Sequence, residues 1–378
     1  MFISSRVRQD SNPIQDAPQG LPLASVDSFT VYSAVDGPTP PQPRERHPRH
    51  RRYHVSIDLI DAAQGALLGT MVGDALGMPA EGLSRDAIKE QFGRLDSLRE
   101  GPLPLGEFTD DTEMMVGLSE ALLETGEFDV QAIAENMAHN FTPWRGYSPH
   151  VYGIMARIRQ GMNWESPGTS SWGSGAAARV APLGVLYADD SNLAEHAAAQ
   201  AKITHTHANG IAGAVAQAMA VAQVTAAGLF ESALTTDELL ECLLDPVSDH
   251  SVAMVDALER IRDLRPPDSP EQLSGTIARV FACDGSAVGT VPAALAAFLH
   301  SHSFEEAVIV AVNCGGDTDT LGALTGALAG AFYGLKNIPE RLTANLVNEK
   351  RGRDHVLALG EKLGLLTRQR SGKRLELE

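Results

Sequence analysis

The chain has 378 residues, 43 % of them hydrophobic but only 5 % aromatic. This length is enough for a large core that needs neither disulfides nor a structural metal. The formal net charge of −18 argues against a nucleic-acid-binding protein, which needs a basic surface. Cys242, Cys283 and Cys314 are too scattered for a disulfide framework or a thiolate zinc site. We expect a cytoplasmic protein in a reducing environment, with no nucleic-acid partner.

Residues 1–56 differ in composition from the rest of the chain. A proline-rich tract at 37–43 precedes a basic run at 44–52, and no helical period is present. This pattern predicts an extended or disordered arm. Its segment 28–32, SFTVY, could order as a strand on a partner. A partner-binding arm and a dispensable tail both remain open.

Targeting and membrane signals are not evident in the sequence. The start, MFISSRVRQD, lacks the apolar run of a secretory signal. We also identify no run approaching the ~18 uncharged apolar residues of a membrane span. We therefore expect no membrane partner.

From Ile57 onward, apolar residues recur with helical spacing, and no segment alternates convincingly as a strand does. This predicts a compact all-α bundle over residues 57–368, followed by a frayed tail at 369–378. The expected helices span 58–77, 112–124, 130–140, 176–187, 193–202, 209–229, 236–244, 252–262, 270–281, 291–299, 304–313, 321–333 and 339–360.

Two of these segments carry a glycine at every fourth position, which places the glycines on one helix face. Each glycine costs about 1 kcal/mol of helix propensity relative to alanine, so we expect two central helices whose backbones approach closely. The glycines are Gly65, Gly69, Gly73 and Gly77 in the first helix, and Gly322, Gly326, Gly330 and Gly334 in the second.

Two acidic clusters precede strongly helical runs, GEFTDDT at 106–112 and NCGGDTDT at 313–320. Either cluster alone is explained by N-capping, which Asp and Thr favour. Together they offer carboxylate and hydroxyl oxygens, the hard ligands that suit Mg²⁺ or Mn²⁺. If the clusters face each other, carboxylates without a cation would repel one another, and a metal pair would relieve this.

Four blocks in order, GALLGTMVGDALGMPAEG, TDDTEM, ITHTHANGIAGAVAQA and NCGGDTDTLGALTGALAGA, resemble the ADP-ribosylglycohydrolase family over about residues 58–365. The resemblance implies an all-α orthogonal bundle with a binuclear metal cleft, usually holding two Mg²⁺ ions. The positions that match its metal ligands are Thr109, Asp110, Asp111, Asp317, Asp319 and Thr320.

The same resemblance suggests further site residues. Gly73 and Asp74 match a part of the family motif near the site, and Glu81 is a candidate gating or ligand-contacting acid. Trp172-Gly173-Ser174-Gly175 resembles the segment that contacts the ADP-ribose phosphates, and amide groups at a helix start suit a diphosphate. Thr204-His205 matches an element lining the same cleft, although an ordinary histidine at a helix start remains open.

The resemblance implies hydrolysis of the bond between ribose and a modified protein side chain. The metals would orient the sugar, and Asp111 or Asp317 would accept a proton from the attacking water. The expected linkage is N-glycosidic, to arginine, while serine-linked ADP-ribose and poly(ADP-ribose) remain open. One departure bears on the acceptor, because Val151 stands where arginine-directed relatives often carry an acid.

The arm at 1–56 adds a hypothesis of another class. Some relatives are immunity proteins against ADP-ribosyltransferase toxins of type VI secretion systems, and this chain is similar in layout. An arm that plugs the toxin's active site would act by binding, independently of the metals. Binding would require residues 1–56, whereas hydrolysis would require Asp110 and Asp317.

Overall fold

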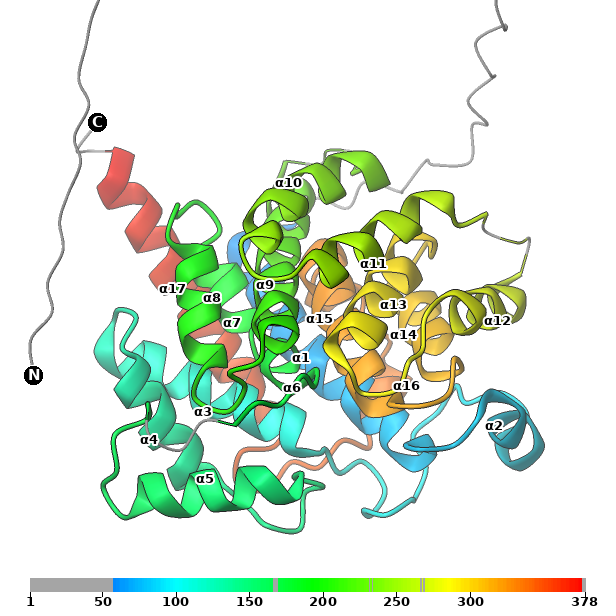
Figure 1. Ribbon diagram of the computed structural model, residues 1–378, viewed down its shortest axis with the longest axis horizontal. Helices are drawn as coiled ribbons and strands as arrows, with labels where there is room; N and C mark the ends of the chain where they lie inside the picture. The colour runs from blue at the N-terminus through cyan, green and yellow to red at the C-terminus, as the bar shows by residue number, and fades with distance from the viewer. Residues whose placement is uncertain are drawn as a thin grey trace, which may run out of the picture. The chain divides into compact units, whose positions relative to one another are not determined.

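The computed structural model describes residues 57–165, 169–230, 232, 234–265, 267 and 269–375. The arm predicted at 1–56 lies outside these residues. Within them all regular elements are helices, accompanied by two isolated β-bridges, Thr169 with His205 and Gly173 with Ser286. The predicted all-α fold is therefore confirmed (Figure 1).

The helices follow one another with mostly short connections. In chain order they are α1 Leu59–Gly77, η1 Met78–Ala80, α2 Arg85–Phe92, α3 Asp110–Thr125, α4 Val130–Asn140, α5 Pro149–Arg159, α6 Gly175–Ala178, α7 Ala181–Leu186, α8 Leu193–Ala201, α9 Ala208–Leu229, α10 Thr236–Ser248, α11 Val252–Asp263, α12 Pro270–Val280, α13 Ala287–Leu299, α14 Phe304–Val312, α15 Thr318–Tyr333, η2 Leu335–Asn337, α16 Glu340–Thr343 and α17 Arg353–Leu375.

Helices α1 and α15 pack against each other at the centre, as the glycine spacing predicts (Figure 1). A Cβ on Gly65 would lie 2.2 Å from the Gly330 carbonyl oxygen, and one on Gly73 would lie 1.8 Å from that of Gly322. No side chain fits at such distances, so the two backbones are in contact. Gly334 differs from the prediction, because it follows α15 with a φ of +79°.

The expectation that no segment is long and apolar enough to span a membrane was wrong, because helix α9 meets both conditions. Ala208–Leu229 is long and apolar enough to cross one, but 83 % of its apolar 18-residue stretch is buried within the protein. It contacts α15, α8, α10 and α6. Its composition is therefore explained by its place in the core.

Several predicted boundaries were wrong. The segment 176–187 forms two short helices, α6 and α7, with a proline in the first turn of α7. The segment 339–360 contains a break between α16 and α17, where Val347 donates its N–H to the Gly106 carbonyl. Helices α2 and α5 were not predicted, and α17 continues to Leu375, well into the tail expected to fray.

Candidate functional site

Asp74, near the end of α1, is fully buried and anchors the start of α3. Its carboxylate accepts the N–H of Thr109 at 3.0 Å and the N–H of Thr112 at 3.1 Å, and it also accepts the Thr112 hydroxyl. A carboxylate that accepts several donors is fixed in one orientation. The central helix α1 thereby sets the position of the first acidic cluster.

The first cluster begins α3. Thr109 is the N-cap, and its hydroxyl accepts the Asp111 N–H at 3.4 Å. The Asp110 N–H donates to the Arg145 carbonyl at 2.8 Å. Capping is thus one role of this motif, and the carboxylates of Asp110 and Asp111 are not used for it.

The second cluster begins α15, after two glycines with left-handed backbone, Gly315 at φ +84° and Gly316 at φ +82°. Asp317 donates its N–H to the Cys283 carbonyl at 2.8 Å, and its Oδ2 accepts the Ser174 hydroxyl at 3.0 Å. Asp317 is therefore positioned by segments that are distant in sequence.

Thr320 lies near both clusters. Its side chain is close enough to the carboxylates of Asp111 and Asp317 to lower the pKa of each against the rise caused by burial, so it relates the acidic starts of α3 and α15. Asp319 is buried beside them. The six positions that match the family's ligands, Thr109, Asp110, Asp111, Asp317, Asp319 and Thr320, accordingly lie at the facing starts of two contacting helices.

The carboxylates of the site disfavour one another's charge. Burial raises the pKa of Asp110, with a further contribution from Asp74, and burial followed by the charge of Asp110 raises that of Asp111. The pKa of Asp319 is raised by burial and then by Asp317. Burial also raises the pKa of Asp74 to about 6. A cation among these groups would favour their charged forms.

Two buried oxygens of the site have no hydrogen-bond partner, Oδ2 of Asp111 and Oδ1 of Asp319. A buried acceptor left unpaired is costly, and hard carboxylate oxygens suit Mg²⁺. In this arrangement, no group of three or more His, Cys, Asp and Glu side chains among the described residues is placed to hold one ion. The donor chemistry fits a divalent cation, and the side chains would have to converge to bind it.

Glu81 follows η1 and is exposed at the edge of the site. Its pKa is raised by partial desolvation of the carboxylate against the site and then by the charges of Asp317 and Asp74. The neighbouring Gly82 N–H donates to the Gly316 carbonyl at 2.8 Å. The turn that carries Glu81 is thus bound to the loop that precedes Asp317.

The segment 172–175 forms another part of the site. Ser174 donates its N–H to the Gly285 carbonyl at 2.9 Å, and the Gly173 N–H donates to the Ser171 hydroxyl at 3.3 Å. These two amides, which we expected to be available for a diphosphate, are occupied within the protein. A Cβ on Gly175 would lie 3.6 Å from the His205 ring, so His205 does adjoin this segment.

His205 is buried, and its Nδ1 lies 2.7 Å from the Thr204 hydroxyl oxygen. Burial lowers the pKa of His205 to about 3, so the ring is neutral at pH 7. Its neighbours include His150, with ring centroids 6.1 Å apart. Val151 stands where arginine-directed relatives often carry an acidic residue. It belongs to α5, and its side chain is buried.

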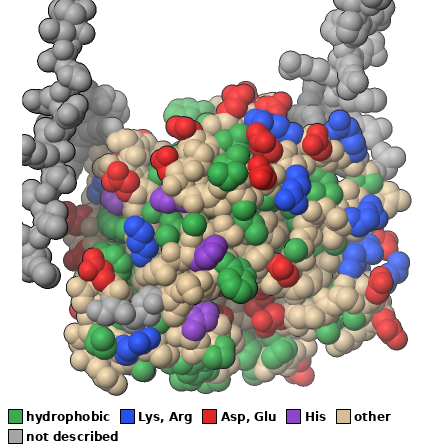
Figure 2. Space-filling model, viewed as in Figure 1, with side chains coloured by type: hydrophobic (Ala, Val, Ile, Leu, Met, Phe, Trp, Pro, Cys, Tyr) green, Lys and Arg blue, Asp and Glu red, His purple; other side chains and the backbone are tan. Residues whose placement is uncertain are grey.

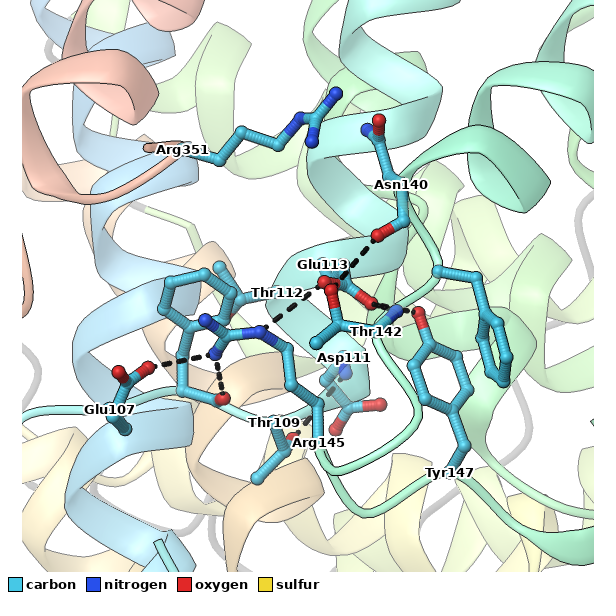
Figure 3. A network of polar contacts seen from close by, with 12 residues as sticks. Glu107, Thr109, Asp111, Thr112, Glu113, Asn140, Thr142, Arg145, Tyr147 and Arg351 are labelled. Atoms are coloured by element: carbon cyan, nitrogen blue, oxygen red, sulfur yellow. Dashed lines mark hydrogen bonds and ion pairs between the residues drawn. The ribbon is translucent and has the colours of Figure 1, made fainter. Parts of the chain in front are cut away.

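Sequence reasoning missed a buried polar network behind the first cluster (Figure 3). The Arg145 side chain pairs with Glu107 at 3.0 Å and Glu113 at 3.3 Å, and donates to the Phe108 carbonyl. Glu113 also accepts the Tyr147 hydroxyl at 2.7 Å. No motif signals this network, because Arg145 and Tyr147 follow Glu107 and Glu113 only after more than thirty residues of sequence.

The loop 284–286 was also missed. A Cβ on Gly285 would lie 3.3 Å from Oδ2 of Asp317. The Gly285 carbonyl oxygen lies 3.0 Å from the Ser174 hydroxyl oxygen and shares its one proton with Asp317. The Asp284-Gly285 pair is a turn signal, which could have marked this loop but not its partner.

The fold is a helical bundle, and the acidic N-termini of α3 and α15 lie close together in it. This arrangement defines a class of helical proteins whose site is rich in carboxylate and hydroxyl oxygens. The model of one family, ADP-ribosylglycohydrolase, matches residues 56–373. The chain belongs to the ADP-ribosylglycohydrolase family.

Known relatives cover most of the chain. An uncharacterised protein of Archaeoglobus fulgidus is 35 % identical over 71 % of this chain and 86 % of its own length. The human ADP-ribosylhydrolase ARH3 is 28 % identical over 73 % of this chain and 86 % of its own. A solved structure titled ADP-ribosylglycohydrolase-related protein complex is 29 % identical, with a TM-score of 0.65 over 82 % of this chain and 99 % of that one.

Proposed function

We propose that this protein is a Mg²⁺-dependent hydrolase that releases ADP-ribose from modified protein side chains. The observation that carries the proposal is the meeting of Asp111, Asp317 and Asp319 around Thr320, with two buried carboxylate oxygens unpaired. Thr109, Asp110 and these residues would hold two Mg²⁺ ions, with Mn²⁺ as a substitute. Bound there, the ions supply positive charge that binds ribose hydroxyls and lowers the pKa of water.

The protein's own residues then position the reacting groups. Ser174 holds Oδ2 of Asp317 at 3.0 Å, and this side chain is more exposed than Asp111. We assign proton acceptance from the attacking water to Asp317, since it combines a fixed orientation with access to solvent. Neutral His205 and the segment 173–175 line the side where the ADP-ribose would lie.

The expected acceptor is arginine, through an N-glycosidic bond. Serine-linked ADP-ribose is the second candidate, and the buried Val151 favours it, because this position offers no carboxylate to a guanidinium. The test is release of ADP-ribose from arginine-modified and from serine-modified protein, each with and without Mg²⁺. Release from one linkage identifies the acceptor, and release from neither in Mg²⁺, by folded protein, contradicts the proposal.

A second function by binding is proposed for residues 1–56. Their proline-rich and basic composition suits a partner-binding arm, with an ADP-ribosyltransferase toxin as the partner and a cytoplasmic site of action. Pull-down with the full chain and with a chain lacking 1–56 tests this. Binding retained after the truncation would contradict it, while hydrolysis should be unchanged by the truncation.

A further inference from the structure

A cavity of about 340 Å³ lies between α2, α12 and α14. Its lining includes Asn313, the first residue of the second acidic cluster, but none of the carboxylates of the acidic site. Figure 2 shows several Lys and Arg side chains at this edge of the molecule, with Asp and Glu side chains beside them. Ligand pockets typically have this size, an apolar lining and a few polar groups. We propose that it binds a small phosphate-bearing molecule of about nucleoside-monophosphate size.

The charge of the cavity is the first argument. Arg85, Lys89 and Arg94 line it, and Glu271 is its one lining carboxylate. A local excess of positive charge is unusual on a chain with a net charge of −18. Three cations around one cavity suit a dianion such as a phosphate monoester.

The state of Arg85 is the second argument. Its Nη2 donates to the Glu271 carbonyl at 2.8 Å, but its Nε is buried and has no hydrogen-bond partner. The guanidinium lies against Gly275, where a Cβ would be 3.3 Å from Cζ. An unpaired buried donor of a charged group is costly. Because Arg85 lines the cavity, an anion there would accept this N–H once the guanidinium turns away from Gly275.

The other two cations are available to a ligand. The Lys89–Glu271 pair, at 2.9 Å, and the Arg94–Asp96 pair, at 3.2 Å, are between two exposed side chains. Exposed pairs of this kind contribute little stability, so either cation can turn to an anion. The apolar floor formed by Ile309, Val310 and Pro270 would receive the uncharged body of the ligand.

The cavity is mechanically connected to the acidic site, and this step rests on the proposed function. Gly316 donates its N–H to the Leu83 carbonyl at 2.8 Å, and a Cβ on Gly315 would lie 2.6 Å from the backbone nitrogen of Arg85. The beginning of α2 therefore packs on the loop that leads to Asp317. We expect a ligand on Arg85 to change the Mg²⁺ affinity or hydrolysis rate at the acidic site.

The test is calorimetric titration of the full chain with adenosine 5′-monophosphate, and with inorganic phosphate in a second arm. Lys89→Glu should weaken binding at least tenfold, whereas Arg260→Glu, the same charge change on exposed α11, should leave it unchanged. Asp317→Asn should change binding far less than Lys89→Glu does, which separates this cavity from the acidic site.

Three results would overturn the proposal. They are no binding of either probe, equal binding by wild type and Lys89→Glu, or binding lost only in Asp317→Asn. Because the titration needs neither Mg²⁺ nor turnover, its failure is distinguishable from failure of the proposed hydrolase function.

Discussion

Replacing Arg145 by methionine should destabilise the protein substantially. Its side chain and that of Glu113 are 9 % and 4 % exposed, so Arg145→Met leaves a buried carboxylate without its cation and the Phe108 carbonyl without its side-chain donor. Breaking a buried ion pair from one side typically costs about 3–5 kcal/mol. We predict a fall of this size in the free energy of unfolding.

Urea denaturation of a double-mutant cycle measures the effect. Adding Glu113→Gln to Arg145→Met removes the stranded charge, so the two losses should not add, with a coupling of about 1–3 kcal/mol. The control is Asp237→Asn, which breaks an exposed pair with Arg262 at 3.1 Å and should cost at most about 1 kcal/mol. A loss below about 1 kcal/mol for Arg145→Met would refute the reasoning.

The other predictions concern the core and the buried histidine. Gly69→Ala places a Cβ 2.2 Å from the Gly326 carbonyl oxygen and should cost about 2 kcal/mol, a cost of overpacking that outweighs the gain in helix propensity. Gly153→Ala, at an exposed position of α5, should instead stabilise by up to about 1 kcal/mol; equal melting temperatures for the two variants would contradict this. Since burial lowers the pKa of His205 from 6.5 to about 3, the unfolded chain binds a proton that the folded chain does not. The free energy of unfolding should fall as pH drops from 6.5 toward 3, and His205→Gln should flatten that fall; an unchanged slope would count against it.

The sequence predicted the features that depend on local spacing. The glycine spacing indicated the contact of α1 with α15, because only a close backbone approach explains such a loss of helix propensity. The motifs TDDT and GGDTDT indicated acidic turns just before two helices, whereas α3 and α15 begin earlier than predicted and include part of each motif. Both are patterns within a few turns of one chain segment, and the structure shows both.

What the sequence could not predict depends on contacts between distant segments. Nothing near Asp317 indicates that Ser174 and Gly285 hold it, since those residues come from separate loops. The prediction that the Gly173 and Ser174 amides are free to bind a diphosphate was wrong for the same reason, because both donate hydrogen bonds within the protein. The break between α16 and α17 also arises from a distant contact, the pairing of Val347 with Gly106.

The most direct test of the account is ADP-ribose release as a function of Mg²⁺ concentration, by wild type and by Asp317→Asn. The account predicts release that rises with Mg²⁺, disappears with a chelator and is lost in Asp317→Asn while folding is retained. Release that is independent of divalent cations, or undiminished in Asp317→Asn, would contradict the claim that the facing starts of α3 and α15 form a metal-dependent hydrolytic site.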